Sequence, residues 1–140
     1  MPELPEVEVL VRQLNPCLRG CRVESVDVWR PKIVRPHSGA ELKVALVGRV
    51  FRSVTRRGKG LQFQFRESPG VLPLTVSGHL GMTGGIYLQS LQAPLPKHVG
   101  VTVDLDEARL IFEDTRQFGR FCLVRLSQDS LGPEPLGKEF

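Results

Sequence analysis

The stretch VGRVFRSVTRRGKGLQFQF, residues 47–65, decides the fold class of this chain. Apolar and polar side chains alternate at 47–55 and again at 61–65, which is the period of a half-buried β-strand. The triplet GKG between them frees the backbone for a tight turn, so the two segments predict one antiparallel hairpin. Similar short segments are residues 23–29, 71–77, 85–88, 99–105, 109–112 and 120–126. About eight short strands, separated by Gly, Pro and Asp, predict a mainly β fold, an antiparallel two-sheet β-sandwich.

Helical spacing appears near the N-terminus. Apolar side chains recur there at intervals of three and four residues: Val7, Leu10, Val11, Leu14 and Leu18. This stripe predicts an amphipathic helix over residues 5–18, packed on the sandwich, and we expect Pro16 to end its regular part. Residues 41–48 are a candidate for a second short helix, and residues 104–110 for a hairpin turn.

Composition bounds the class of protein. The chain has 140 residues, 41% of them hydrophobic and 24% charged, which favours one domain with a real core. No apolar run reaches the roughly 18 residues of a membrane span, and the acidic N-terminus does not resemble a secretory signal. We therefore expect no membrane partner and a location in the cytoplasm or nucleoid.

Cysteine and histidine spacing argues against a metal site. The chain has three of each: Cys17, Cys21, Cys122, His37, His79 and His98. The cysteines lack CxxC spacing and the histidines are scattered, so we expect neither a disulfide framework nor a zinc site. No cofactor is expected.

Basic residues are clustered along the chain. The formal net charge is +4, and the basic groups are Arg49, Arg52, Arg56, Arg57 and Lys59, then Arg30, Lys32 and Arg35, then Arg116 and Arg120. Such runs are usually solvated surface, but together with the net charge they fit a polyanionic partner such as nucleic acid.

The first residues, MPELPEVE, raise a chemical possibility. Removal of Met1 by aminopeptidase would leave Pro2 with a free secondary amine, whose pKa the start of the following helix would lower. Such an amine is a nucleophile toward a sugar C1′, and Glu3 beside it could shuttle protons. Proline and glutamate are also ordinary residues at a helix start, so the position alone does not establish this role.

Motifs along nearly the whole chain resemble one family. MPELPEVE closely resembles the N-terminal signature of the formamidopyrimidine-DNA glycosylase and endonuclease VIII family, which repairs oxidised bases by base excision. The other matching motifs are VTRRGKGLQF (54–63), GHLGMTG (78–84), EDTRQFGR (113–120) and LGPEPL (131–136). They follow the family's order and similar spacing, and PELPE points to the formamidopyrimidine branch.

The resemblance implies roles for particular residues. Pro2 would be the nucleophile, Glu3 the general acid/base, Glu6 an organiser of the site, and Lys59 a phosphate contact that assists the lyase steps. The residues implied to bind DNA are Arg57 in the basic hairpin, His79 at the phosphate backbone, and Met82, Arg116 and Phe118, which would fill the gap left by a flipped base. The implied partner is duplex DNA that carries an oxidised base or an abasic site.

The resemblance also implies a domain organisation. Residues 1–130 would be the N-terminal catalytic domain, and residues 131–140 a linker or tail toward a helix–two-turn–helix and zinc-finger half that this sequence does not include. We expect a bifunctional DNA glycosylase/AP lyase domain for 8-oxoguanine and formamidopyrimidines, impaired without that half. The alternatives are a non-catalytic DNA-binding module on the same scaffold, or a protein-interaction module whose motif matches are accidental.

Overall fold

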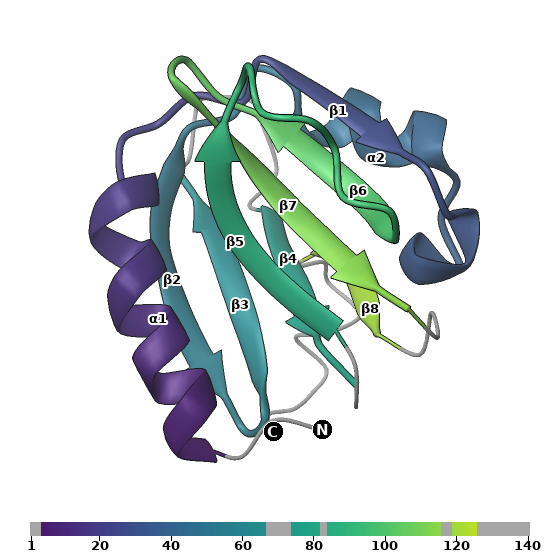
Figure 1. Cartoon of the computed structure of the whole chain (residues 1–140). Helices are drawn as coiled ribbons and strands as arrows, with labels where there is room; N and C mark the ends of the chain where they lie inside the picture. The colour runs from purple at the N-terminus through teal and green to yellow at the C-terminus, as the bar shows by residue number, and fades with distance from the viewer. Residues whose placement is uncertain (1–3, 67–73, 82–83, 116–118, 126–140) are drawn as a thin grey trace.

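The computed structural model describes residues 4–66, 74–81, 84–115 and 119–125 (Figure 1). The elements in chain order are α1 (Leu4–Leu18), β1 (Ser25–Val28), η1 (Pro31–Val34), α2 (Gly39–Leu46), β2 (Phe51–Arg57), β3 (Gly60–Phe65), β4 (Leu74–His79), β5 (Gly84–Ser90), β6 (Val99–Asp104), β7 (Ala108–Asp114) and β8 (Arg120–Arg125). Here α labels an α-helix, η a short 3₁₀-helix and β a strand.

The strands form two antiparallel sheets. One sheet has the order β1-β6-β7-β5 and the other the order β2-β3-β4-β8. Each strand lies at one of the segments predicted from the sequence, and α2 occupies the predicted second helix. The predicted fold class, a two-sheet β-sandwich with an N-terminal helix, is therefore confirmed.

The prediction that Pro16 ends the regular helix is wrong. Pro16 lies inside α1, which continues to Leu18. Proline removes one backbone hydrogen bond from a helix. Leu14 and Leu18, on either side of it, are 4% and 0% exposed, so burial of the apolar stripe offsets that loss.

Helix α1 lies along the free edge of β2 (Figure 1). The backbone N–H of Val54, in the middle of β2, donates to Oδ1 of Asn15 at 2.8 Å. An edge strand exposes unpaired N–H groups, and this contact satisfies one of them. It also fixes the position of α1 along the length of β2. The start of α1 therefore has a defined place beside the end of the β2–β3 hairpin.

A row of phenylalanine rings runs through the core between the sheets. Phe51 contacts Phe63 edge-on with ring centroids 6.2 Å apart, Phe63 contacts Phe121 at 5.7 Å, and Phe121 contacts Phe112 at 5.9 Å. These rings are at most 2% exposed. Aromatic pairs add to the stability given by area burial alone, so this row links β2, β3, β8 and β7.

Candidate DNA-binding and catalytic site

The turn between β2 and β3 lies level with the end of β4. The two strands pair as far as Arg57, and the turn beyond it consists of Gly58 and Lys59. Leu61 pairs with Gly78 of β4, so the next residue of β4, His79, lies beside this turn. The side chains of Arg57 and Lys59 are exposed, and that of His79 is half-buried. Three groups that can donate to phosphate therefore lie at one end of this sheet.

The other sheet ends at the same place. Gly84, the first residue of β5, pairs with Asp114, the last residue of β7. The N–H of Gly119 donates to Oδ2 of Asp114 at 2.6 Å, and the following residue, Arg120, pairs with His79. The ends of β4 and β7 and the starts of β5 and β8 therefore meet around Asp114.

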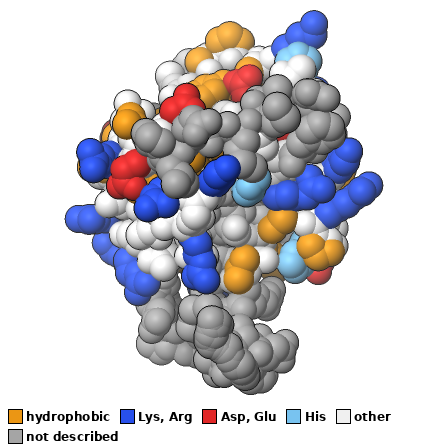
Figure 2. Space-filling model, turned by 90° about the horizontal axis from the view of Figure 1, so that it is seen from below, with side chains coloured by type: hydrophobic (Ala, Val, Ile, Leu, Met, Phe, Trp, Pro, Cys, Tyr) orange, Lys and Arg blue, Asp and Glu red, His pale blue; other side chains and the backbone are white. Residues whose placement is uncertain are grey.

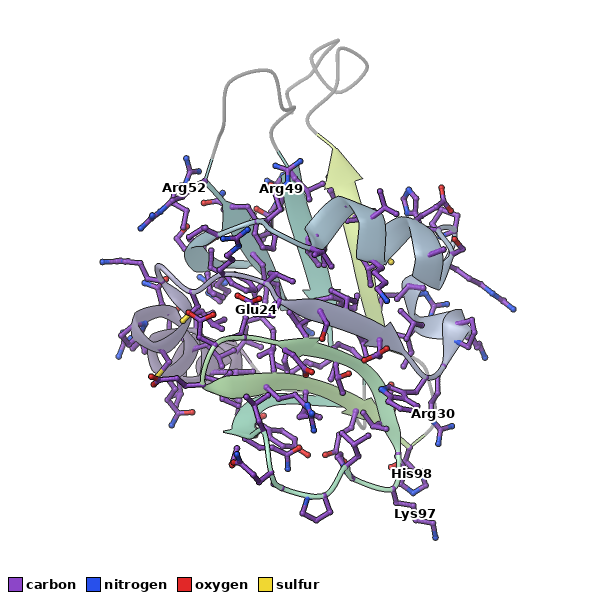
Figure 3. The ribbon with its side chains drawn as sticks, turned by 90° about the horizontal axis from the view of Figure 1, so that it is seen from above. Glu24, Arg30, Arg49, Arg52, Lys97 and His98 are labelled. Atoms are coloured by element: carbon purple, nitrogen blue, oxygen red, sulfur yellow. The ribbon has the colours of Figure 1, made fainter. Side chains whose placement is uncertain are left out.

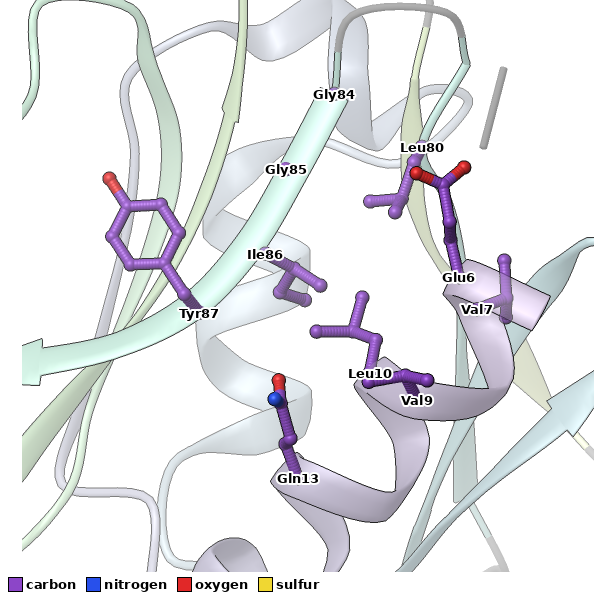
Figure 4. Close-up of a pocket in the computed structure, with 10 residues that line it drawn as sticks. All are labelled: Glu6, Val7, Val9, Leu10, Gln13, Leu80, Gly84, Gly85, Ile86 and Tyr87. Carbon is purple, nitrogen blue, oxygen red and sulfur yellow. The ribbon is translucent and has the colours of Figure 1, made fainter. Parts of the chain in front are cut away.

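A groove of about 300 Å³ separates the first half of α1 from β5 (Figure 4). Its walls are mostly apolar, and its lining residues are Glu6, Val7, Val9, Leu10, Gln13, Leu80, Gly84, Gly85, Ile86 and Tyr87. We call it the α1–β5 groove. The carboxylate of Glu6 rises from the first turn of α1 beside Leu80, at the end of the groove nearest Gly84. An apolar cavity with one polar group at its mouth is the usual form of a small-ligand site.

An ion pair joins α1 to the hairpin. Nε of Arg56 lies 2.9 Å from Oε1 of Glu8, and Nη1 of Arg56 donates to the carbonyl of Gly58 at 3.0 Å. Glu8 and Arg56 are 41% and 38% exposed, so the pair contributes little to stability, but it holds the hairpin turn near the start of α1.

These segments together form what we call the helix-start end of the sandwich. It comprises the first turn of α1, the β2–β3 turn, His79, Gly84, Asp114 and Gly119. Figure 2 looks onto this end and shows more lysine and arginine side chains than acidic ones. Cations at the surface attract a polyanion, and the N–H groups of the helix start add partial positive charge.

The basic run at residues 49–59 is divided between two ends of the molecule. Arg56, Arg57 and Lys59 lie at the helix-start end, whereas Arg49 and Arg52 lie at the other end of β2 (Figure 3). A strand rises about 3.3 Å per residue, so roughly 13 Å of strand separates Arg52 from Arg56, and a longer stretch separates Arg49 from Lys59. The sequence run is therefore not one continuous patch.

His98 belongs to the helix-start end, although its sequence position suggested no role. The N–H of Asp114 donates to the carbonyl of His98 at 3.1 Å. Arg30 and Lys97 lie beside His98 (Figure 3), and Nε of Arg30 donates to the carbonyl of Val99 at 3.2 Å. This position could have been predicted from the hairpin expected over residues 99–112. Pairing of its two strands, 99–105 and 109–112, places residue 98 opposite the end of the second strand.

Tyr87, Cys21 and Cys122 are poor nucleophiles at neutral pH. Burial raises the pKa of Tyr87 to about 12, and its hydrogen bond to Glu113 adds to the effect. Its hydroxyl points away from the α1–β5 groove (Figure 4). Burial also raises the pKa of the thiols of Cys21 and Cys122. Neither of these two thiols is therefore activated.

The residues present do not fit a zinc site. Sγ of Cys21 donates to the carbonyl of Cys17, whereas Sγ of Cys122 donates to the carbonyl of Arg35 on a different part of the fold. In residues 4–66, 74–81, 84–115 and 119–125, no group of three or more His, Cys, Asp or Glu could hold a metal ion. Nor does either α-helix in these ranges have the length and apolar character to span a bilayer.

The structure describes only some of the residues that the sequence assigned to the site. Glu6, Lys59, His79 and Arg57 lie at the helix-start end. The others lie outside the described residues: Pro2, Glu3, Met82, Arg116 and Phe118. In the sequence these five lie within two positions of described residues: Glu3 precedes Leu4, Met82 follows Gly81, and Phe118 precedes Gly119.

Fold and site define a two-sheet β-sandwich domain with an N-terminal helix and a cationic end. The model of the formamidopyrimidine-DNA glycosylase N-terminal domain matches residues 1–121. The chain belongs to this family, a family of base-excision repair glycosylases. The interpretation of the motifs as accidental matches is therefore wrong.

Individual relatives carry the same description. Formamidopyrimidine-DNA glycosylase of Carboxydothermus hydrogenoformans is 38% identical over 140 residues, covering 100% of this chain and 50% of that protein. The enzyme of Nocardia farcinica is 40% identical over 146 residues, covering 97% of this chain and 49% of that protein. The chain thus spans about half the length of the curated relatives it matches.

Solved structures share the fold. The crystal structure of Lactococcus lactis Fpg with DNA containing an abasic site has a TM-score of 0.82 and 32% identity, covering 91% of this chain and 46% of that one. A complex of an inhibited form of the same protein with DNA containing N7-benzyl-Fapy-dG also has a TM-score of 0.82, with 33% identity and coverage of 91% and 46%.

Proposed function

We propose that this chain is the catalytic domain of a bifunctional DNA glycosylase and AP lyase that acts on 8-oxoguanine and formamidopyrimidines in duplex DNA. The observation that carries the proposal is the convergence of Glu6, Lys59 and His79 at the helix-start end. A carboxylate at the start of α1 and cations beside it suit a site that acts on a sugar next to a phosphate. The relatives crystallised with damaged or abasic DNA support the same substrate class.

Pro2 is the proposed nucleophile. Its nitrogen attacks C1′, the glycosidic bond breaks, and the base leaves with a proton from Glu3. The sugar ring opens as the nitrogen loses its proton and O4′ gains one, which leaves an iminium ion. Loss of the C2′ proton then expels the 3′ phosphate, a second elimination expels the 5′ phosphate, and water hydrolyses the iminium to regenerate the amine.

Lys59, Arg57 and His79 are proposed to hold the DNA backbone beside the lesion. Lys59 occupies a two-residue turn that leaves its side chain exposed, and Arg57 precedes that turn. Their charges would strengthen hydrogen bonds to phosphate oxygens and oppose the negative charge that develops on the leaving phosphates. His79 adds a donor on the neighbouring strand.

Met82, Arg116 and Phe118 are proposed to enter the gap left by the flipped nucleotide. An apolar wedge resists collapse of the stack, and arginine can donate to the orphaned base. The segments that carry these residues begin and end at described positions of the helix-start end, which supports the assignment.

The α1–β5 groove is a candidate receptor for part of the extruded nucleotide. It opens beside the first turn of α1, and its volume of about 300 Å³ exceeds what one base needs. The aliphatic side chains of its walls can pack against a base, and the carboxylate of Glu6 can accept a hydrogen bond from an N–H of the base edge. This position agrees with the organising role proposed for Glu6.

A borohydride trap tests the proposed nucleophile. We expect the purified chain, shown by intact mass to lack Met1, to form a reduced adduct with duplex DNA carrying an abasic site. Peptide mapping should place the adduct on Pro2. A matched chain that retains Met1 should give no adduct on Pro2, because the proline nitrogen is then an amide.

The second candidate is a non-catalytic DNA-binding module on the same scaffold. It is favoured by the fact that these 140 residues cover only about half the length of the relatives they match. An adduct on Pro2 would exclude this candidate. No adduct from chains that lack Met1, together with salt-dependent binding of the same duplex, would establish it.

A further inference from the structure

Three basic side chains form one row across the sheet β2-β3-β4-β8. The register sets Arg57 of β2 opposite Gly60 of β3, and His79 of β4 opposite Arg120 of β8. Gly60 and His79 are themselves neighbours, because the residues next to them, at positions 61 and 78, are paired. The row thus crosses the whole sheet, a distance of about 14 Å at the usual strand spacing. We call Arg57, His79 and Arg120 the basic row.

The basic row points away from the hydrophobic core. Successive side chains of a strand face opposite sides of the sheet. Phe121, which follows Arg120, is 2% exposed, so Arg120 faces outward. A Cβ atom on Gly78 would lie 3.2 Å from a ring of the buried phenylalanine row, so the next residue, His79, faces outward as well. Arg57 is exposed, and the basic row therefore lies on the outer face of this sheet.

The charges of the basic row are not neutralised by the described residues. The ion pairs among those residues use other arginines, and neither Arg57 nor Arg120 pairs with a described carboxylate. Nη1 of Arg120 donates to the carbonyl of Gly119 at 2.9 Å, which orders the side chain without cancelling its charge. Burial raises the pKa of the Cys122 thiol, and the nearby charge of Arg120 opposes that rise. Unpaired cations on a surface attract a polyanion.

One position of the row carries no side chain. Gly60 lies between Arg57 and His79, and a Cβ atom there would lie 2.8 Å from the carbonyl oxygen of Gly78. A glycine in a strand allows a ligand to approach the backbone closely. A phosphate over Gly60 would therefore have a basic side chain on each side.

We propose that Arg120 is a further DNA-binding residue, which holds a phosphate of the damaged strand beyond the phosphates held by Arg57 and His79. The inference rests on the proposed function, which places the lesion beside the Lys59 turn. Arg120 lies about 14 Å from Arg57 along the row. Since one strand advances about 3.4 Å per nucleotide along the helix axis, this phosphate lies within about four nucleotides of the lesion. The basic row thus guides the damaged strand away from α1 and toward β8.

A matched pair of substitutions separates this contact from the effect of net charge. Arg120→Gln and Arg52→Gln each remove one cation from the same sheet. Arg52 is the control, because it lies at the other end of β2 (Figure 3), and its Nη2 donates to a neutral acceptor, Oε1 of Gln64, at 3.3 Å. Arg120→Lys keeps the charge at the tested position. Urea titration of all three variants checks that they fold as the wild type does.

The first measurement is the binding of the full chain to a duplex with a stable abasic-site analogue, over a range of salt concentrations. Arg120→Gln should weaken binding about tenfold and lower the slope of log affinity against log salt by about one, because one phosphate contact is lost. Arg120→Lys should restore most of the affinity. Arg52→Gln should bind as the wild type does.

The second measurement locates the contact. Phosphates of the damaged strand are replaced one at a time by neutral methylphosphonates, and the affinity for each duplex is measured. At the phosphate that Arg120 holds, the replacement should weaken wild-type binding about tenfold but leave Arg120→Gln almost unchanged, because losses from two partners of one contact do not add. Lys59→Gln should lose its sensitivity at a different phosphate, nearer to the lesion.

Three outcomes would overturn the inference. They are equal binding by Arg120→Gln and Arg52→Gln, wild-type sensitivity of Arg120→Gln at every phosphate of the damaged strand, or no salt-dependent binding by the wild type. Borohydride trapping on a natural abasic site tests the proposed chemistry separately. If no adduct forms on Pro2 while the phosphate replacements give the expected pattern, the proposed lyase chemistry fails and the DNA contact of Arg120 stands.

Discussion

Two cavities flank α1, and the larger one is not the candidate site. The α1–β5 groove, at the start of the helix, has a volume of about 300 Å³. A second cavity of about 500 Å³ lies where the chain leaves the helix, and we call it the α1-exit cavity. Its lining residues are Cys17, Arg19, Gly20, Cys21, Leu88, Leu105, Asp106, Glu107 and Ala108.

The difference between these cavities is chemical. The α1-exit cavity holds two acidic side chains, Asp106 and Glu107, beside the carbonyl end of a helix, which also carries partial negative charge. The thiol of Cys21 is a weak nucleophile, because burial and then the nearby Asp106 raise its pKa. The α1–β5 groove opens instead beside the positive start of the helix and the Lys59 turn. The two cavities therefore differ in charge as well as in volume, and charge favours the α1–β5 groove as the candidate site for a polyanion.

The largest expected effect is on the free energy of unfolding. It tests whether the helix-start end and the end with the α1-exit cavity share one hydrophobic core. Phe63 is 0% exposed and sits in the middle of the phenylalanine row that ends at Phe112, against Gly119. Phe63→Ala should lower the free energy of unfolding by about 3–5 kcal/mol in urea titration. Val44→Ala, at a position 82% exposed, should change it by at most about 0.5 kcal/mol. Separate unfolding transitions for the two ends would break the comparison.

A pair of charge substitutions tests whether DNA binds at the helix-start end rather than at the α1-exit cavity. Lys59→Gln and Arg19→Gln each remove one exposed cation, the first at the helix-start end and the second at the α1-exit cavity. We expect Lys59→Gln to weaken binding to abasic duplex about tenfold and to reduce the salt slope by about one, because a phosphate contact is lost. Equal losses from the two variants would show that net charge alone drives binding.

The smallest effect concerns a side chain that lines the α1–β5 groove. Tyr87 is the only tyrosine, so tyrosinate absorbance reports it alone. Its pKa of about 12, against the ordinary 10.0, means that the folded state holds the proton more tightly. The corresponding stability is fully present below pH 10 and is lost as pH rises toward 12. Glu113→Gln should bring the absorbance midpoint nearer to 10.0, and an unchanged midpoint would contradict the role given to Glu113.

Most of the fold followed from side-chain periodicity, because alternation and helical spacing are local properties. The segments 61–65 and 99–105 matched β3 and β6 within one residue at each end. Errors arose where tertiary contacts override local preference. β2 begins at Phe51 rather than at residue 47, and α1 continues through Pro16 because burial of its stripe outweighs one lost hydrogen bond.

The sequence indicated which residues to expect at the site, but not which of them would lie next to one another. Lys59, His79 and Glu6 were singled out through the resemblance of the motifs to one family, since a lone lysine, histidine or glutamate is more often an ordinary surface or structural residue. Strand register is a long-range property, so only the folded structure could set His79 beside the Lys59 turn and divide the basic run at residues 49–59 between two ends. The burial of Asp114 and its bond to Gly119 were likewise decided by tertiary packing, since they depend on β4 and β7 ending, and β5 and β8 beginning, at one point.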